Sequence, residues 1–253
     1  TQALGHRHPV VAKAIIDFLA TDVPSWYPAR VNPFAGRLAK MLCERSGYQQ
    51  IYFGCSGSDT VEAAIKLARA ATSRPRIISL EGAYHGCTMG SCSLMTKGPF
   101  RDPFGPHVPG AESIPFNDAD TLLAALRTED VAAVVVEPIQ GEGGVRTLSD
   151  RFVDALCELT QKYGTLLVAD EVQTAIGRSG HFLFSHQWPR RPEVVLIAKA
   201  LGGGLMPVSA TLSQMEVFNR AYGRQFEAAE SHNSTFSYNA ISCVAAMATL
   251  GLI

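Results

Sequence analysis

Residues 194–204 read VVLIAKALGGG, and this stretch places a single lysine, Lys199, between a run of apolar residues and a run of glycines. Five consecutive apolar residues are typical of a short strand that is buried on both faces of a parallel sheet. Lys199 then lies at the carboxyl end of that strand, the edge at which open α/β sheets bind ligands. Lysine is seldom buried without a partner, so two interpretations stay open: Lys199 reaches a salt bridge, or it forms a Schiff base with a carbonyl compound.

Apolar runs of strand length alternate with helical patterns along most of the chain. The clearest run is VAAVVV at 131–136, where six consecutive aliphatic residues indicate a strand covered on both faces. Alternating strands and helices predict right-handed βαβ units, a largely parallel sheet and an α/β fold. We expect strands at 50–54, 76–80, 131–136, 165–169 and 194–198, a half-exposed strand at 206–213, helices at 9–21, 34–44, 61–68, 119–127, 150–163 and from about 240, and irregular loops at 100–116 and 219–231.

The composition is that of a globular protein that acts on small polar molecules. Of its 253 residues 47% are hydrophobic and 18% charged, and 22 Lys and Arg against 23 Asp and Glu give a net charge of −1. This balance predicts neither a nucleic-acid surface nor a polybasic membrane patch, and no apolar run reaches transmembrane length. The six cysteines form no CxxC pair, which indicates free thiols in a reducing cytoplasm, and His6 and His8 match no common zinc spacing, so we expect no metal site.

A candidate anion site follows the strand at 50–54. The chain turns there through Gly54 and Gly57 into a helical pattern, and it presents backbone N–H groups, hydroxyls and the positive end of a helix dipole. Gly57 and Ser58 are therefore candidates for holding a phosphate. The alternative interpretation is that Ser58 or Asp59 only caps the helix.

The other strands also end in polar or aromatic residues. Because the carboxyl ends of parallel strands meet at one edge of a sheet, these side chains converge on the same place as Lys199. An aromatic ring there can stack on a planar ligand, and an acid can pair with a cation. Any one of them could be an ordinary loop residue, but their convergence favours a binding site. The candidates are Tyr84, His85, Glu137, Glu142, Asp170 and Gln173, while Trp26 and Tyr27 either line a pocket or cover the core.

Pyridoxal 5′-phosphate is a cofactor that requires this combination of groups. A lysine holds its aldehyde as an imine, an aspartate paired with its pyridine nitrogen keeps that nitrogen protonated, and its phosphate binds well at a helix amino end. Lys199, Asp170 and the turn at Gly57 and Ser58 can supply these three functions. The combination favours a Schiff-base role for Lys199 over a salt bridge.

Seven segments carry a family resemblance: LGHRHP, CSGSDTVEAAIKLAR, GAYHG, VVVEPIQGEGG, LLVADEVQTAIGRSG, IAKALGGGLMPVSA and HNSTFSYN. They occur in the order found in the class III pyridoxal-phosphate aminotransferases, which include the acetylornithine, ornithine and γ-aminobutyrate aminotransferases. The pairing of ADEVQ with AKALGGG at this separation is highly specific, and the resemblance covers nearly the whole chain. It implies fold type I, with a large domain built on a mixed, mostly parallel seven-stranded sheet with flanking helices, and a small domain built from both chain ends.

The resemblance implies a role for each matched residue. Lys199 would form the imine and then move a proton between the α-carbon of the substrate and C4′ of the cofactor, and Asp170 would pair with the pyridinium. The phosphate loop reads SGSD where many members have SGTE or SGAE, a conservative change. The other implied cofactor contacts are Gln173 with the phenolic oxygen, Gly57 and Ser58 with the phosphate, Tyr84 stacked on the ring with His85 beside it, and Thr235 with the phosphate of the neighbouring subunit.

The resemblance further implies a homodimer whose active sites lie at the subunit interface, where Thr235 would contribute. In relatives, the glutamate at the position of Glu142 can pair with an arginine and release it for 2-oxoglutarate, but that arginine lies beyond Ile253. We expect residues 1–33 to form a connecting segment and residues 34–253 the cofactor-binding large domain, with the small domain largely missing. The chain stops inside an apolar helical pattern, so we expect a fragment.

The expected reaction is a ping-pong transfer of an amino group from an amino donor, an ω-amine or an amino acid, to an oxo acid or aldehyde. Related enzymes with the same residues decarboxylate or isomerise, so a pyridoxal-phosphate decarboxylase or aminomutase is the alternative. A serine hydrolase that uses Ser56, Asp170 and His232 is a remote alternative, because the loop lacks the full GxSxG pattern. The candidate substrate contacts are Trp26, Tyr27, Glu137 and Glu142.

Overall fold

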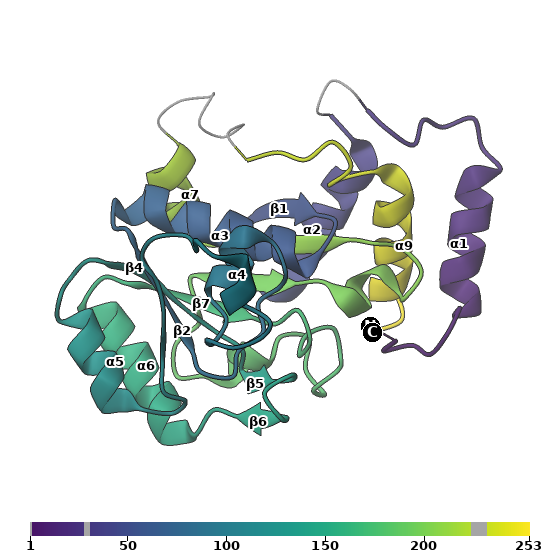
Figure 1. Cartoon of the computed structure of the whole chain (residues 1–253). Helices are drawn as coiled ribbons and strands as arrows, with labels where there is room; N and C mark the ends of the chain where they lie inside the picture. Colours follow the sequence, from purple (N-terminus) through teal and green to yellow (C-terminus); the bar gives the residue numbers. More distant parts are fainter. Residues whose placement is uncertain (1, 28–30, 224–231) are drawn as a thin grey trace.

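The structure, a computed structural model, describes residues 2–27, 31–223 and 232–253. Seven strands form one sheet in the order β1-β9-β8-β7-β4-β2-β3 (Figure 1). The strands from β8 to β3 pair in parallel, whereas β9 runs antiparallel to both of its neighbours. The α/β fold with a mixed, mostly parallel seven-stranded sheet is therefore confirmed. The strands are β1 Gln50–Gly54, β2 Arg76–Leu80, β3 Ala111–Ile114, β4 Val131–Val136, β7 Leu166–Asp170, β8 Val194–Ile197 and β9 Ser209–Ser213, and a separate hairpin pairs β5 Ile139–Gln140 with β6 Arg146–Thr147.

Helices cover both faces of the sheet. One face packs against α2, α5, α6 and α9, and the other is covered by α3, with α4 and α7 beside it; α1 packs on α9 (Figure 1). In β4, Val134 and Val136 pack into the core on the face that α2, α5, α6 and α9 cover, whereas Ala133 and Val135 pack into the core beneath α3. This double burial is why the central strands are continuous apolar runs. The helices are α1 Pro9–Leu19, α2 Pro33–Ser46, α3 Gly57–Thr72, α4 Met89–Ser93, α5 Ala119–Leu126, α6 Asp150–Lys162, α7 Met215–Tyr222 and α9 Ala240–Leu250, with 3₁₀ turns η1 Asp102–Phe104, η2 Phe184–Gln187 and η3 Lys199–Gly202.

A capping box starts α3, the helix that follows β1. The hydroxyl of Ser56 accepts a hydrogen bond from the Asp59 N–H at 3.2 Å, and the Asp59 carboxylate accepts one from the Ser56 N–H at 3.1 Å. The interpretation of Ser58 as the cap is therefore wrong, and Asp59 is the reciprocal partner of the cap. Ser58 is instead the second residue of the helix.

Two strand predictions are wrong, for different reasons. Residues 111–114, expected in an irregular loop, form β3, an edge strand that pairs only with β2 among the described residues. Its short, polar sequence between Pro109 and Pro115 carries no strand pattern. Conversely, β9 begins at Ser209 and is buried throughout rather than half-exposed, because α3 covers one of its faces. The buried hydroxyl of Thr211 has a hydrogen-bond partner there, since it donates to the Thr60 carbonyl at 3.3 Å.

The polar stretch expected as a loop at 219–231 begins inside α7, so the prediction is wrong for residues 219–222. Residues 224–231 of that stretch lie outside the described residues. The connecting segment at 1–33 includes α1, which packs on α9 near the other end of the chain. The division into 1–33 and 34–253, and the largely missing small domain, stay predictions.

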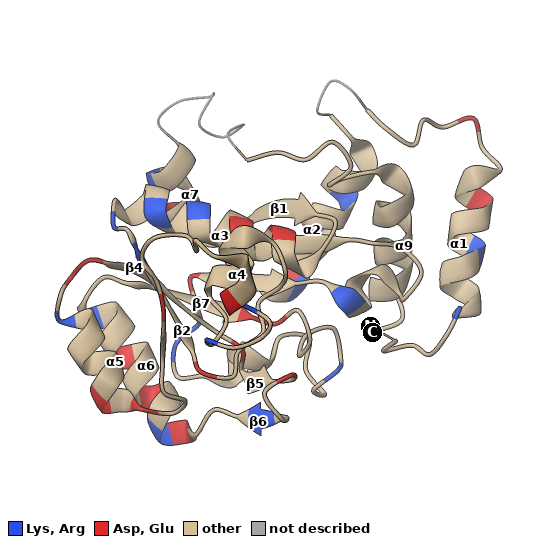
Figure 2. Ribbon diagram, in the orientation of Figure 1, with Lys and Arg blue, Asp and Glu red and all other residues tan. Residues whose placement is uncertain are grey.

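Charged residues are dispersed rather than grouped by sign. Figure 2 shows both signs on α1, α3 and α6. Over the part of the chain that the structure describes, no helix combines the length and apolar character needed to cross a membrane, and no three or more His, Cys, Asp or Glu side chains are grouped so that they could hold a metal ion.

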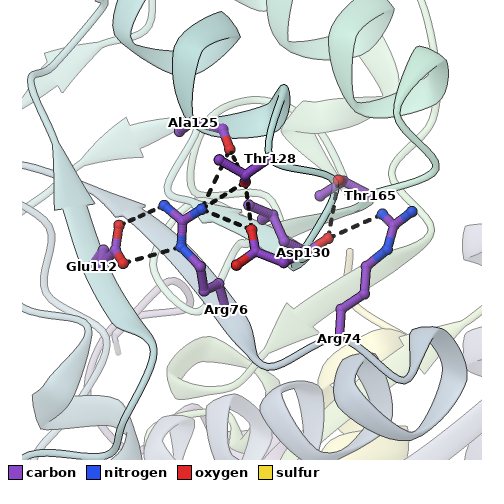
Figure 3. Close-up of polar contacts among 8 residues, drawn as sticks. Arg74, Arg76, Glu112, Ala125, Thr128, Asp130 and Thr165 are labelled. Carbon is purple, nitrogen blue, oxygen red and sulfur yellow. Dashed lines mark hydrogen bonds and ion pairs between the residues drawn. The ribbon is translucent and has the colours of Figure 1, made fainter.

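An arginine network lies at the amino ends of β2 and β4. Figure 3 shows Arg76 between Glu112 and Asp130, with Arg74 beside them. Arg76 bonds both oxygens of Glu112 in β3, at 3.0 and 2.7 Å, and also Asp130 at 2.8 Å. Arg74 donates to the carbonyl oxygens of Val131, at 3.3 Å, and of Tyr163, at 2.8 Å. The two arginines therefore join β2, β3, β4 and the end of α6.

We expect Arg76→Ala to lower the free energy of unfolding by about 1–2 kcal/mol, at or below the low end of the ~1.5–3 kcal/mol of a charged hydrogen bond, because Glu112 and Asp130 are partly exposed. Urea denaturation measures the change. Lys13→Ala is the control, since it breaks an exposed ion pair with Asp17 within α1 and should cost no more than about 0.5 kcal/mol. Equal effects of the two substitutions would show that the Arg76 network adds nothing beyond a surface ion pair.

Candidate active site

A cavity of about 450 Å³ lies at the carboxyl edge of the sheet. It is lined by residues that follow β1, β2, β4, β7 and β8, and by residues 204–208, which lead into β9. Because β9 is antiparallel, its amino end meets the carboxyl ends of the other strands. The volume lies within the ~300–1,000 Å³ that is usual for small-molecule sites.

Lys199 enters this cavity from a strained backbone. β8 ends at Ile197, and Lys199 begins the turn η3 with a φ of +43°, a conformation that a residue with a Cβ seldom adopts. Such strain costs about 1–3 kcal/mol and is often found at functional sites. The Lys199 Nζ donates a hydrogen bond of 3.0 Å to Oε1 of Gln173. The salt bridge that was one interpretation of Lys199 is not formed among the described residues.

Asp170 lies one strand away from Lys199, at the end of β7, and is only 4% exposed. Its Oδ2 is 2.7 Å from Nδ1 of His85, and its Oδ1 accepts a hydrogen bond of 3.1 Å from the Val172 N–H. His85 is itself buried, and its Nε2 has no partner among the described residues. The structure therefore places His85 in direct contact with Asp170.

The charges around His85 favour its protonated form. Burial lowers the pKa of His85, but the hydrogen bond and charge of Asp170, together with the charge of Glu137, outweigh burial and raise the pKa above its usual value. A protonated His85 in turn partly offsets the two buried carboxylates beside it.

The start of α3 forms a further wall of the cavity. Gly57 and Ser58 are its first two residues, and no described residue accepts from their N–H groups, as expected for the first turn of a helix. A Cβ on Gly57 would lie 2.9 Å from Val172 Cγ1, so only glycine fits there. The hydroxyl of Ser58 accepts a hydrogen bond of 3.1 Å from the Cys87 N–H.

Tyr84 lines the cavity from the loop after β2 and is 38% exposed. Its N–H donates to Oε1 of Glu137 at 2.9 Å, and its Oη lies 3.0 Å from Sγ of Cys87. The hydrogen bond with Cys87, aided by burial, raises the pKa of Tyr84 to about 12. At neutral pH the ring is therefore uncharged and suited to stacking.

Residues 1–253 match the model of the family described as Aminotransferase class-III. The chain belongs to the class III aminotransferase family. Solved structures agree: the ornithine aminotransferase of Toxoplasma gondii ME49 has a TM-score of 0.91 at 30% identity, over 99% of this chain and 60% of that one. An amine transaminase from an uncultivated Pseudomonas species in a PLP-bound form has 0.87 at 29%, over 98% and 63%. The taurine:2-oxoglutarate aminotransferase of Bifidobacterium kashiwanohense, in complex with PLP and glutamate, has 0.88 at 27%, over 99% and 61%.

The chain spans about 60% of the length of these structures. The part that it spans contains a seven-stranded sheet and the cavity at its edge.

Two observations show that the cavity fits pyridoxal phosphate (PLP), the cofactor bound in two of these solved structures. The first turn of α3 offers the unpaired N–H groups of Gly57 and Ser58 to a phosphate. The buried carboxylate of Asp170 and the amine of Lys199 line the same cavity, where a ring nitrogen and an aldehyde could be held.

Some predicted site residues do not line this cavity. Thr235 is exposed, and its carbonyl accepts a hydrogen bond of 3.0 Å from Nε1 of Trp26, so the two residues lie together elsewhere. Tyr27 also does not line the cavity. Glu142 lies in an adjoining cavity of about 310 Å³ that shares Tyr84 with the first. A contact of Thr235 with a neighbouring subunit stays a prediction.

The sequence did not reveal the role of Glu171, which is completely buried next to Asp170. Its carboxylate accepts hydrogen bonds from Thr174 Oγ1, the Phe184 N–H and both the N–H and the hydroxyl of Ser185. These bonds fasten the loop at 171–185. No local pattern separates this acid from a solvated one after a strand, and the only signal was its place beside Asp170.

The structure does not assemble a serine hydrolase site. The Ser56 hydroxyl caps α3, and the carboxylate of Asp170 pairs with His85 rather than with His232. The ring of His232 lies instead 4.7 Å from the ring of Tyr52.

The His85–Asp170 pair gives stability a pH dependence whose sign follows from the raised pKa of His85. Its stabilising effect is fully present below the usual histidine pKa of about 6.5 and is lost as the pH rises through the higher folded-state pKa. The free energy of unfolding of the wild type should therefore fall as the pH rises through this range, and we expect His85→Gln to lack this contribution to the fall. Urea unfolding at several pH values between about 6 and 9 measures it. His6→Gln, on an exposed loop, should keep the wild-type profile, and the same profile for His85→Gln would contradict the assignment.

Proposed function

We propose that the protein is a pyridoxal-phosphate-dependent aminotransferase, which moves an amino group from an amino donor to an oxo acid or aldehyde by a ping-pong mechanism. The observation that supports this most is the placement of Lys199 and Asp170 at the ends of adjacent strands, facing one cavity together with the amino end of α3. The ornithine, amine and taurine transaminases with the same fold support the same class of reaction.

When bound, the cofactor supplies an electron sink that stabilises negative charge on the reacting carbon. The residues of this chain bind and orient the reactants around it. Gly57 and Ser58 would hold its phosphate through the first turn of α3, and the ring of Tyr84 would stack on its ring. Asp170, held by His85, would keep a proton on the ring nitrogen.

Lys199 carries the reacting proton. Its Nζ would hold the cofactor through the aldehyde and, when free as an amine, would accept and return the proton of the substrate. Gln173 keeps Nζ in the cavity through the hydrogen bond of 3.0 Å.

The finer assignments follow from the same proposal. An ω-amine or an amino acid as donor fits the transaminases with this fold. The substrate contacts that we propose are Glu142, in the adjoining cavity, and Trp26 and Tyr27, which lie outside the main cavity. A homodimer, in which Thr235 reaches the phosphate of the second subunit, would give that exposed residue a function. The six free cysteines support a reducing cytoplasm.

The test is an absorbance spectrum of the protein with added pyridoxal phosphate, followed by borohydride reduction and peptide mapping. We expect a visible band whose reduced adduct maps to Lys199. An adduct at another lysine, or no band in a folded protein, would overturn the proposal.

The same spectrum separates transamination from its alternatives. An amino donor should convert the cofactor to its amine form, and an oxo acid should restore it. Release of carbon dioxide without this cycle would indicate a decarboxylase, and an isomerised amino acid would indicate an aminomutase.

A further inference from the structure

We propose that Glu137 is a positioning residue that holds Tyr84 and, through Gly141, the amide of Gln173 in their places in the cavity wall. This inference rests on the proposed function, because it assigns Glu137 to the support of a cofactor site. It replaces the weaker idea that Glu137 contacts the substrate.

The two oxygens of Glu137 anchor two different loops. Glu137 directly follows β4, the strand between β2 and β7, and is 5% exposed. Its Oε1 accepts a hydrogen bond of 2.9 Å from the Tyr84 N–H in the loop after β2. Its Oε2 accepts one of 3.2 Å from the Gly141 N–H in the loop after β4. One buried carboxylate thus fixes the backbone that carries Tyr84 and the backbone at Gly141.

Gly141 passes the effect on to Lys199. A Cβ on Gly141 would lie 2.6 Å from both Cδ and Nε2 of Gln173, so the glycine backbone packs directly against that amide. Oε1 of the same amide accepts the hydrogen bond from Lys199. A shift of Gly141 therefore changes the space that is left for the Gln173 amide. The position of the Lys199 amine, which is bonded to that amide, then changes with it.

Other contacts hold other parts of these loops, among them the carbonyl of Gly141, which accepts from the N–H groups of Gly144 and Val145. The Glu81 carbonyl accepts hydrogen bonds from Gln140 Nε2 at 3.1 Å and from Arg146 at 2.9 Å. Arg146 also donates to Gln140 Oε1 at 2.6 Å. Among the described residues, the N–H groups of Tyr84 and Gly141 depend on Glu137 alone.

The surroundings of Glu137 raise its pKa above the usual glutamate value. Burial raises the pKa of Glu137 and Asp170 raises it further, whereas the charge of His85 lowers it. Glutamine has nearly the same shape, but its NH₂ group cannot accept a hydrogen bond. Glu137→Gln therefore sets a donor against one of the two N–H groups while filling the same space.

The experiment compares Glu137→Gln with Glu171→Gln in the full-length protein. Glu171 is a matched control because it is also buried after a strand and also accepts from two backbone N–H groups, but it does not line the cavity. The readouts are the Kd for pyridoxal phosphate, the rate at which borohydride traps it on Lys199, and the thermal midpoint without cofactor.

We expect Glu137→Gln to raise the Kd about tenfold, as for loss of one charged hydrogen bond, and to slow trapping. Glu171→Gln should lower the thermal midpoint at least as much and leave the Kd within about twofold. If Glu137→Gln lowers only the thermal midpoint, Glu137 is a structural residue and the proposal is wrong.

Gly141→Ala tests the second half of the proposal without altering Glu137. Its methyl group would displace the Gln173 amide, so trapping on Lys199 should slow. Unchanged trapping in Gly141→Ala would overturn the link to Lys199, even if Glu137→Gln does not fold. Failure of the wild-type protein to bind pyridoxal phosphate at Lys199 would overturn the proposed function itself, a result distinct from either variant behaving like the wild type.

Discussion

Lys199→Ala is expected to lower the rate of amino-group transfer by about 10⁴-fold, the upper limit of what a positioned general base contributes. The effect should be this large because the proposed function gives Lys199 two tasks, holding the cofactor and moving the reacting proton. Within the cavity its Nζ is the group that can attack an aldehyde, and Gln173 holds it there. Single-turnover kinetics with a saturating amino donor measure the loss.

Two further variants separate the chemistry of Lys199 from its backbone. Lys199→Arg keeps the positive charge, but a guanidinium is always protonated and cannot act as a base, so it should be as inactive as alanine. Lys199→Gly should be inactive yet more stable than Lys199→Ala by about 1 kcal/mol, because glycine adopts the φ of +43° without strain. Activity in Lys199→Arg near that of the wild type would show that Lys199 supplies only charge.

The central strands and the edge of the sheet that carries the site could be predicted because the signals for them lie in consecutive residues. β4, β7 and β8 are buried on both faces, so each reads as an apolar run, and the residues directly after each run must lie at one edge of the sheet. This rule alone is enough to bring Lys199 and Asp170 to the same edge.

The missed features depend on contacts distant in sequence. β3 is short and polar and becomes a strand only because β2 pairs with it. Glu137 and Glu171 look like solvated acids in the sequence, and only the fold shows the N–H groups that each of them accepts from. The left-handed backbone of Lys199 has no local signal either, since glycine is the residue that usually indicates it.

Asp170→Asn is expected to lower kcat/KM for the amino donor by about 10²–10³-fold. An opposite charge at contact distance shifts a pKa by about 1–3 units, and each unit corresponds to a factor of ten in the protonated population. The substitution removes that charge from the ring nitrogen while keeping the size of the side chain. Asp130→Asn, at the opposite edge of the sheet beside Arg76, is the control and should keep wild-type kinetics.

His85 shows whether Asp170 acts through its charge. His85→Asn removes the 2.7 Å contact with Asp170 and should cost about tenfold in kcat/KM, comparable to one charged hydrogen bond. On the proposal that His85 acts through Asp170, adding His85→Asn to Asp170→Asn should cost little more. The double-mutant cycle would then give an interaction energy close to the whole effect of His85→Asn. Additive losses would mean that His85 acts on the ligand directly, through the Nε2 that has no partner among the described residues.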